Sequence, residues 1–304
     1  MSSKLSAAVT TTKNRKGGRV LEYGPDVAYL LFNIWYLLAG VLALYLSPLH
    51  WAVMNSNSPA SSSAATSRMR SILIRNFATC YIGYAPWHWY LYGANGGAPP
   101  KAAKRKFNTN MPDPSQHERD RFWTFVGFAI SAYLECILVE ATLNRRGEKN
   151  YDATSFSAAF VAVATFSVPW FREVHFYFSH RALHLRTLYK YIHSLHHKSI
   201  NTAVWSGLAM HPLEHLVYFT CLVPYAIMLY LSNGAWYAAI PFYYAKLHSE
   251  LSPIMGHHGF EGLGGSEFHH GHHELFNCNY GSPAVPLDYW LKTDAASMKA
   301  KKSK

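Results

Sequence analysis

Long apolar runs constrain this chain more than any other feature of its sequence. The strongest cover residues 26–46 and 122–143, and weaker runs cover about 71–94 and 154–171. The hydrocarbon core of a bilayer is about 30 Å thick, so a helix needs about 20 apolar residues to cross it. Inside lipid, a helix satisfies its own backbone polar groups. The sequence therefore predicts an all-α integral membrane helical bundle.

The composition and charge agree with membrane integration. Half of the 304 residues are apolar and 15% are charged, whereas a soluble protein carries about 25% charge. The net charge is +11, and the basic residues gather in blocks beside the apolar runs. Such blocks are typical of topology determinants and of contacts with anionic lipid headgroups. Because no base-reading motif accompanies them, we expect no nucleic-acid partner.

The order of apolar and polar stretches predicts the domain organisation. We expect a disordered basic cytosolic arm over 1–25, a transmembrane anchor region over 26–174, a histidine-rich region over 175–293 and a lysine-rich tail over 294–304. About four spans place both termini on one side, which the positive-inside rule assigns to the cytosol. A hairpin over 216–247, turning at Asn233-Gly234, is short for a full crossing, so we expect it to be re-entrant. The histidine-rich region then forms a cytosolic helical cap.

Two acids interrupt the apolar run 122–143. Ionised side chains are costly in lipid and normally face a helix bundle or a cavity. We expect Glu140 to lie at the headgroup level and Glu135 to hydrogen bond to a neighbouring helix, rather than either to act in catalysis.

Histidine is the residue that indicates chemistry in this chain. Of 18 histidines, 15 fall between His175 and His273. They form an HxxxH box (His180, His184), an HxxHH box (His193, His196, His197) and an HHxHH box (His269, His270, His272, His273). Histidine is the commonest metal ligand in proteins. Three spaced boxes therefore indicate a metal centre rather than unrelated histidines.

Helical geometry limits how the boxes share ligands. On an α-helix, residues i and i+4 lie on one face, so His180 and His184 can hold one ion. Adjacent His196 and His197 point about 100° apart, so they reach different sides of one site or two ions. One straight helix from 180 to 197 would separate His184 from His196 by about 120°. The chain is therefore expected to bend between the first two boxes, although no Gly or Pro marks the break.

The number of imidazoles predicts two metal ions. Catalytic zinc takes three protein ligands and keeps one position open, whereas the boxes offer eight ligands besides His270. Imidazole suits zinc, copper, iron and nickel, so ligand type alone does not choose the metal. Two metals beside a membrane-buried cavity favour iron, because oxidation of an unactivated C–H bond in a lipid needs the strong oxidant that O₂ and two irons supply.

Residues 175–293 resemble the fatty acid hydroxylase/sterol desaturase superfamily of membrane histidine-box di-iron proteins. The matching stretches, in the family's order, are FYFSHRALH, LYKYIHSLHH, MHPLEH, GHHGFE, FHHGHHELFNCNYG and PLDYWLKT. The upstream helices resemble the family's anchor only in kind. The resemblance implies nine iron ligands: His180, His184, His193, His196, His197, His257, His269, His272 and His273. His257 matches the family's His-x-Gly-aromatic-acid pattern, with His258 as the competing choice.

We expect most of the remaining histidines to lie outside the ligand set. His211 and His215, an i,i+4 pair, are expected to have structural or ligand-supporting roles, with Glu214 as a partner. His248 is an open candidate for the site, and His270 is expected outside the ligand set. We expect His175 to be a packing residue. Three more are expected to be unrelated to the site: His50, His88 and His117. The closing Asn279-Tyr280-Gly281 resembles the family's NYG motif, which shapes the wall of the site.

The resemblance implies an O₂-dependent membrane oxidoreductase that hydroxylates or desaturates a lipid. A sterol or sterol precursor is favoured, in a reaction of the C-5 desaturase or C-4 methyl oxidase type. The alternatives are a fatty acid or sphingolipid hydroxylase and a squalene epoxidase-like monooxygenase. More remote alternatives are a membrane zinc hydrolase and a non-catalytic lipid- or metal-binding protein.

Electrons are expected from a separate protein. The chain has no HPGG stretch of the cytochrome b5 type and no full G-x-G-x-x-G stretch. By resemblance, the donor is cytochrome b5 with an NAD(P)H-dependent reductase, or a ferredoxin. The last residues, Lys301-Lys302-Ser303-Lys304, resemble a dilysine retrieval signal. They predict the endoplasmic reticulum membrane, with both termini and the boxes cytosolic, although a lysine-rich tail that binds anionic lipid is the alternative.

Overall fold

A computed structural model of the chain describes residues 33–54, 62–93, 105–147, 153–261 and 266–302. Among these residues the only β-pairing is an isolated bridge between Lys106 and Phe260, so the all-α prediction is confirmed. The α-helices are α3 (Ile34–Tyr45), α4 (Pro48–Met54), α5 (Ser62–Tyr92), α7 (Pro114–Arg146), α8 (Ala158–Leu183), α9 (Arg186–Tyr191), α10 (Pro212–Phe219), α11 (Val223–Leu231), α12 (Trp236–Leu251), α13 (Pro253–His257), α14 (Ser266–Leu275), α15 (Leu287–Trp290) and α16 (Ala295–Lys302). The 3₁₀ segments are η1 (His193–Lys198), η2 (Val204–Leu208) and η3 (Thr220–Leu222).

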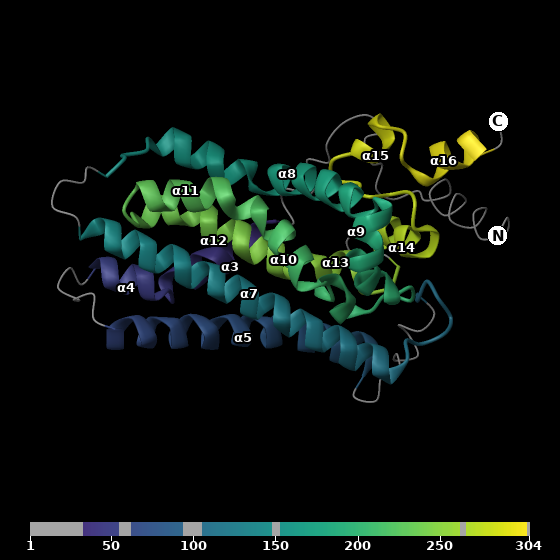
Figure 1. The fold of residues 1–304 in the computed structure, drawn as a ribbon, viewed down its shortest axis with the longest axis horizontal. Helices are drawn as coiled ribbons and strands as arrows, with labels where there is room; N and C mark the ends of the chain where they lie inside the picture. The colour runs from purple at the N-terminus through teal and green to yellow at the C-terminus, as the bar shows by residue number, and fades with distance from the viewer. Residues whose placement is uncertain (1–32, 55–61, 94–104, 148–152, 262–265, 303–304) are drawn as a thin grey trace.

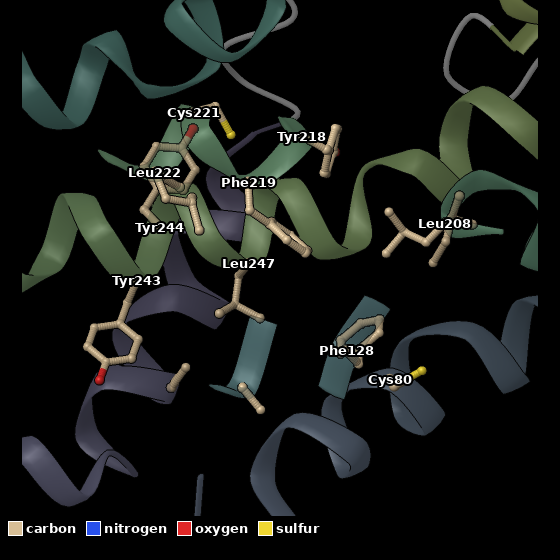
Figure 2. Packing of buried hydrophobic residues seen from close by; sticks show 14 of the residues in the cluster. Cys80, Phe128, Leu208, Tyr218, Phe219, Cys221, Leu222, Tyr243, Tyr244 and Leu247 are labelled. Carbon is tan, nitrogen blue, oxygen red and sulfur yellow. The ribbon is translucent and has the colours of Figure 1, made fainter. Parts of the chain in front are cut away.

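The long helices form an elongated bundle, with α5 and α7 side by side along it (Figure 1). Helix α12 is the central element, because it packs against α3, α8 and α11 and is buried over most of its length. The core between these helices is aromatic and aliphatic. Figure 2 shows part of it, with Phe128 close to Cys80. The shorter helices α9, α13 and α14 gather toward one end of the bundle.

Local sequence signals explain where the main helices begin and turn. The Asp113 side chain accepts a hydrogen bond from the Ser115 backbone N–H, with Pro114 at the first helical position of α7. Between α11 and α12, Asn233 (φ 55°) and Gly234 (φ 75°) both take left-handed backbone conformations. Asparagine and glycine tolerate that region best, and the predicted turn lies there.

Among the described residues, two segments are long and apolar enough to cross a membrane: Pro114–Arg146 and Pro212–Leu231. The second of these is one arm of the predicted hairpin, which begins earlier than expected because Pro212 starts α10 after the cap at His211. Helix α3 is apolar but spans 12 residues. Large apolar side chains also point outward from α5, α7 and α8, including Ile74 and Phe166. Such a surface suits contact with lipid.

The finer topology stays a prediction. The count of four spans and the cytosolic position of the cap are not confirmed by these helices. The runs 71–94 and 154–171 fall largely within α5 and α8. Neither helix is one of the two segments that are long and apolar enough to cross a membrane. The predicted arm over 1–25, the start of the run 26–46 and the last two residues of the tail lie outside the described residues.

The two acids in the apolar part of α7, Glu135 and Glu140, both pair with arginines of α5. Glu135, whose side chain is fully buried, forms an ion pair with Arg75 and accepts a hydrogen bond from the Tyr243 hydroxyl at 3.0 Å. The prediction that Glu135 bonds to a neighbouring helix is confirmed. Glu140 accepts two hydrogen bonds from Arg68, at 2.6 and 2.7 Å, and its side chain is 32% exposed. Polar links therefore join α5, α7 and α12 inside the bundle.

We predict that Glu135→Ala lowers stability much more than Glu140→Ala. Removing one member of a buried ion pair leaves an uncompensated charge and costs about 3 kcal/mol or more, here on Arg75. A partly exposed pair contributes about 1 kcal/mol or less. Thermal unfolding of the detergent-solubilised protein measures the difference. Equal unfolding temperatures for the two variants would contradict this account of the network.

Candidate metal centre

The chain changes direction between the first and second histidine boxes, as predicted. Helix α8 ends at Leu183, Leu185 is extended (φ −60°, ψ 135°), and α9 ends before Ile192 (φ −121°, ψ −68°). Both φ values are negative, so neither position needs the left-handed conformation that favours glycine. That explains why neither Gly nor Pro marks the break. His184 and His193 therefore lie on separate elements, with their ring centroids 4.8 Å apart.

The second box is a 3₁₀ helix, not the regular α-helix that its i+3 and i+4 spacings led us to expect. Residues three apart eclipse in a 3₁₀ helix, and the rings of His193 and His196 are accordingly stacked, with centroids 5.3 Å apart. The tighter winding turns adjacent His196 and His197 toward different neighbours. His197 approaches His184 and His272, whereas His196 approaches His257.

The nine predicted ligands lie together in two adjoining groups. One potential ligand atom from each residue lies within 4.8 Å of those of all other members of its group. The first group holds five histidines: His180, His184, His193, His197 and His272. The second holds four: His196, His257, His269 and His273. Eight of the nine are buried, and His184 is partly exposed, so both groups are largely shielded from water.

The structure separates His257 from its competitor. His257 lies at the end of α13, and its Nε2 is 3.4 Å from His196 Nε2. The Nδ1 of His258 instead accepts a hydrogen bond from the backbone N–H of Phe260. His258 belongs to neither group.

The hydrogen bonds made by Nδ1 set the protonation of the facing rings. The Nδ1 of His180 lies 2.5 Å from the Tyr280 carbonyl oxygen, and that of His272 lies 2.6 Å from the Cys278 carbonyl oxygen. His257 makes the same contact with Pro253 at 2.8 Å. A carbonyl oxygen only accepts, so each Nδ1 carries the proton. In the neutral ring, Nε2 is then a bare lone pair.

Two such lone pairs face each other without a proton between them: the His193 Nδ1 lies 2.7 Å from the Glu214 carboxylate, and the Nε2 atoms of His180 and His193 lie 3.1 Å apart. In the first group, the Nε2 atoms of His184, His197 and His272 form a triangle with sides of 3.1, 3.2 and 3.3 Å. Two nitrogens bound to one metal at about 2.1 Å each lie about 3 to 3.4 Å apart. Facing lone pairs repel, and a cation between them removes the repulsion. The arrangement thus fits metal ligation.

Burial supports the same conclusion. Both ring nitrogens of His273 and the Nε2 of His269 are buried without a hydrogen-bond partner among the described residues. An unsatisfied buried polar atom is costly, and a metal ion would satisfy it. Burial and the neighbouring histidines lower the pKa of His184 to about 2, and burial above all lowers the pKa of His272 to about 3. The rings are therefore neutral, which is the form that binds metals.

Glu214 supports His193. Its Oε1 lies 2.7 Å from His193 Nδ1, while its Oε2 has no hydrogen-bond partner among the described residues. A carboxylate behind a metal-binding imidazole fixes the ring's tautomer and raises its basicity. The sequence suggested Glu214 only as a partner of His211 or His215, because nothing in the HPLEH stretch shows that it reaches back to the second box.

Asp288 positions the NYG motif, a role that the sequence did not indicate. Its carboxylate accepts hydrogen bonds from the backbone N–H groups of Tyr280 at 2.9 Å and Gly281 at 2.7 Å. Asn279 takes a left-handed conformation, with φ 58°. This turn presents the Tyr280 carbonyl to His180. A lone aspartate in the PLDYWLKT stretch carries no signal of that role.

Helix α7 holds the loop after the second box. The buried Asp120 accepts hydrogen bonds from the hydroxyls of Ser199, at 2.8 and 2.9 Å, and Ser206, at 2.7 Å. The Thr124 hydroxyl donates to the Trp205 carbonyl oxygen at 2.8 Å. These contacts connect the metal centre to the apolar bundle.

The other histidines lie outside both groups. His211 caps α10 by accepting a hydrogen bond from the Leu213 backbone N–H, and His215 stacks on Phe219. His248 packs edge-on against Tyr36. Each of the remaining five contacts a neighbour elsewhere: His50 with Trp51, His88 with His117, His175 with Thr220 and His270 with Phe107.

Comparisons with known proteins match the same region. The fatty acid hydroxylase family model matches residues 165–293. A Delta(7)-sterol 5(6)-desaturase of Gibberella zeae is 29% identical over 140 residues, which are 43% of this chain and 42% of that protein. Methylsterol monooxygenase 1 of Danio rerio is 33% identical over 124 residues, covering 39% of this chain and 42% of the relative. Fatty acid hydroxylase domain-containing protein 2 of Macaca fascicularis is 38% identical over 124 residues, covering 40% and 35%.

Each of these matches covers less than half of the chain. The chain spans less than half the length of each of these curated relatives. No solved structure matches it significantly. The matched segment nevertheless contains all nine grouped histidines, together with Glu214, the NYG motif and Asp288. Residues 165–293 of this chain therefore match the fatty acid hydroxylase family model, and the chain is similar to sterol desaturases and methylsterol monooxygenases over less than half of its length.

Proposed function

We propose that this chain is a membrane di-iron oxidoreductase that uses O₂ and two electrons to hydroxylate or desaturate a lipid. The observation that carries the proposal is the pair of adjoining histidine groups, in which three rings donate their Nδ1 protons outward to carbonyls and turn Nε2 lone pairs inward. Family membership of the matched segment supports it.

Each histidine group would hold one iron. The first would be bound by the five-histidine group around His272, and the second by the four-histidine group around His257. When bound, two irons supply the strong oxidant that an unactivated C–H bond requires. The chain's own residues position the imidazoles, and burial excludes bulk water. Zinc is the alternative metal, since imidazole binds it equally well.

The proposed substrate is a sterol or a sterol precursor. Curated relatives named as sterol desaturases and a methylsterol monooxygenase support this choice, for a reaction of the C-5 desaturase or C-4 methyl oxidase type. An acyl or sphingolipid substrate is the second candidate, and the relative named as a fatty acid hydroxylase domain-containing protein favours it.

The remaining assignments follow from this reaction. Each turnover needs two electrons, for which we propose an external donor of the cytochrome b5 type with its NAD(P)H-dependent reductase. A net charge of +11 suits an acidic donor, because complementary charge speeds association. We place the protein in the endoplasmic reticulum membrane, with the histidine boxes in the cytosol, on the strength of its basic blocks and lysine-rich tail.

We predict that the purified protein contains about two irons per chain, one in each group, and that His196→Ala lowers this to about one and abolishes lipid oxidation. His196 belongs to the four-histidine group, which keeps three ligands after the change. Elemental analysis and lipid profiling measure the two effects. His270→Ala is the matched control, since His270 lies in the same histidine-rich region but outside both groups. A His196→Ala protein with full iron and full turnover would exclude His196 as a ligand.

We predict that Glu214→Ala weakens metal binding more than Glu214→Gln. Loss of a partner behind a metal-binding histidine costs about 10- to 100-fold in metal affinity, and glutamine retains a side-chain oxygen that accepts the His193 Nδ1–H. Competition with a metal chelator measures the affinity. Glu118→Ala, at an exposed position of α7, serves as the control. The assignment fails if Glu214→Ala retains metal as tightly as that control.

A further inference from the structure

We propose that the crevice between α8 and α10 is the path by which the hydrocarbon of the lipid substrate reaches the metal centre, and that Val217 sets its width. This inference rests on the proposed function and adds to it the route and a residue that determines specificity. The two helices pack against each other beside the first histidine group.

The crevice ends at the metal centre. Its lining includes His180, a member of the five-histidine group, and Glu214, which supports His193. The rest of the lining is mainly apolar: Phe176 and Leu183 from α8, Met210, and Val217 and Tyr218 from α10. A hydrocarbon chain loses no hydrogen bonds on entering such a space, whereas a charged or polar group would.

The polar groups of the lining are concentrated at the inner end. The Ser179 hydroxyl is already used, because it donates to the His175 carbonyl oxygen of its own helix at 2.8 Å. Glu214 is 2% exposed, and its Oε2 has no partner among the described residues. The wall therefore changes from apolar to polar where it meets His180, so the apolar part of a substrate lies in the crevice and the reacting carbon lies beside the metal.

The outer end opens onto the surface expected to face lipid. Helix α10 begins the segment Pro212–Leu231, one of the two segments long and apolar enough to cross a membrane. Its outer side chains are apolar and exposed, at 51% for Leu213 and 44% for Leu216. A lipid in the bilayer thus has a continuous apolar route from this helix surface to His180.

The crevice is narrow in this structure. Its free volume is about 10 Å³, which is about the space of one water molecule. A methyl or methylene group therefore enters only when lining side chains move aside. Val217 lines the crevice and is 40% exposed, so it stands at the mouth, where a change of side-chain size alters access without touching a ligand.

The test compares Val217→Trp with Leu216→Trp. Leu216 is the preceding residue of α10 and has similar exposure, but it does not line the crevice. The assay uses membranes of expressing cells, which contain the native electron donor, and a lipid extract of cells that lack the protein, in which its substrate accumulates. We expect Val217→Trp to lower kcat/KM at least roughly tenfold, with iron content equal to wild type, and Leu216→Trp to retain activity.

A second measurement does not depend on catalysis. All four native cysteines are buried, so the Val217→Cys variant carries a single accessible thiol. We expect the same lipid extract to slow alkylation of this new thiol by N-ethylmaleimide, and not to slow alkylation of the thiol in the Leu216→Cys variant.

The possible results distinguish failure of the proposed substrate path from failure of the proposed lipid oxidation. Val217→Trp protein that oxidises the lipid at the wild-type rate overturns the path, and so does alkylation of the Val217→Cys variant that the lipid leaves unchanged. Iron-loaded wild-type protein that oxidises nothing in the extract overturns the proposed function instead. In that case, lipid protection of the Val217→Cys variant would still support the crevice as a lipid-binding site.

Discussion

The repulsion between facing imidazole lone pairs is the constraint on which the rest of this structure depends. The Nε2 atoms of His180 and His193 lie 3.1 Å apart, and both rings hold their proton at Nδ1, so no proton lies between them. Tight anchoring is needed to hold such groups together, and a bound cation would remove the repulsion. Backbone carbonyls of Pro253, Cys278 and Tyr280 anchor three of the rings from outside. The ligand cluster therefore requires turns placed accurately behind each ring.

Helix α7 connects the loop beside the histidine groups to the apolar helical bundle. At one end, Asp120 and Thr124 hold the loop that follows the second histidine box. Further along, Glu135 pairs with α5 and accepts a hydrogen bond from α12. One helix thus carries both the loop contacts and the polar links of the bundle, so packing in the apolar region stabilises the position of the histidines.

The sequence indicated the ligand set better than it indicated how the ligands are divided. Box spacing and resemblance pointed to the nine histidines that the structure brings together. Adjacent positions on a helix already directed His196 and His197 to different sides, but the stacking of His193 on His196 depends on a 3₁₀ segment, which the spacing does not distinguish from an α-helix. The roles of Glu214 and Asp288 depend on contacts between segments far apart in the chain. Single acids of this kind carry no periodic signal.

The anchors would also make the two proposed metal positions chemically different. Carbonyl oxygens behind His180, His257 and His272 are neutral acceptors, whereas Glu214 behind His193 is a carboxylate. A carboxylate partner raises the basicity of its imidazole more than a carbonyl does. His193 belongs to the five-histidine group, so that group has both more ligands and the stronger donor. The crevice reaches the centre from the side of His180, a member of this same five-histidine group. The proposed substrate path therefore ends at the group that has the carboxylate-supported imidazole.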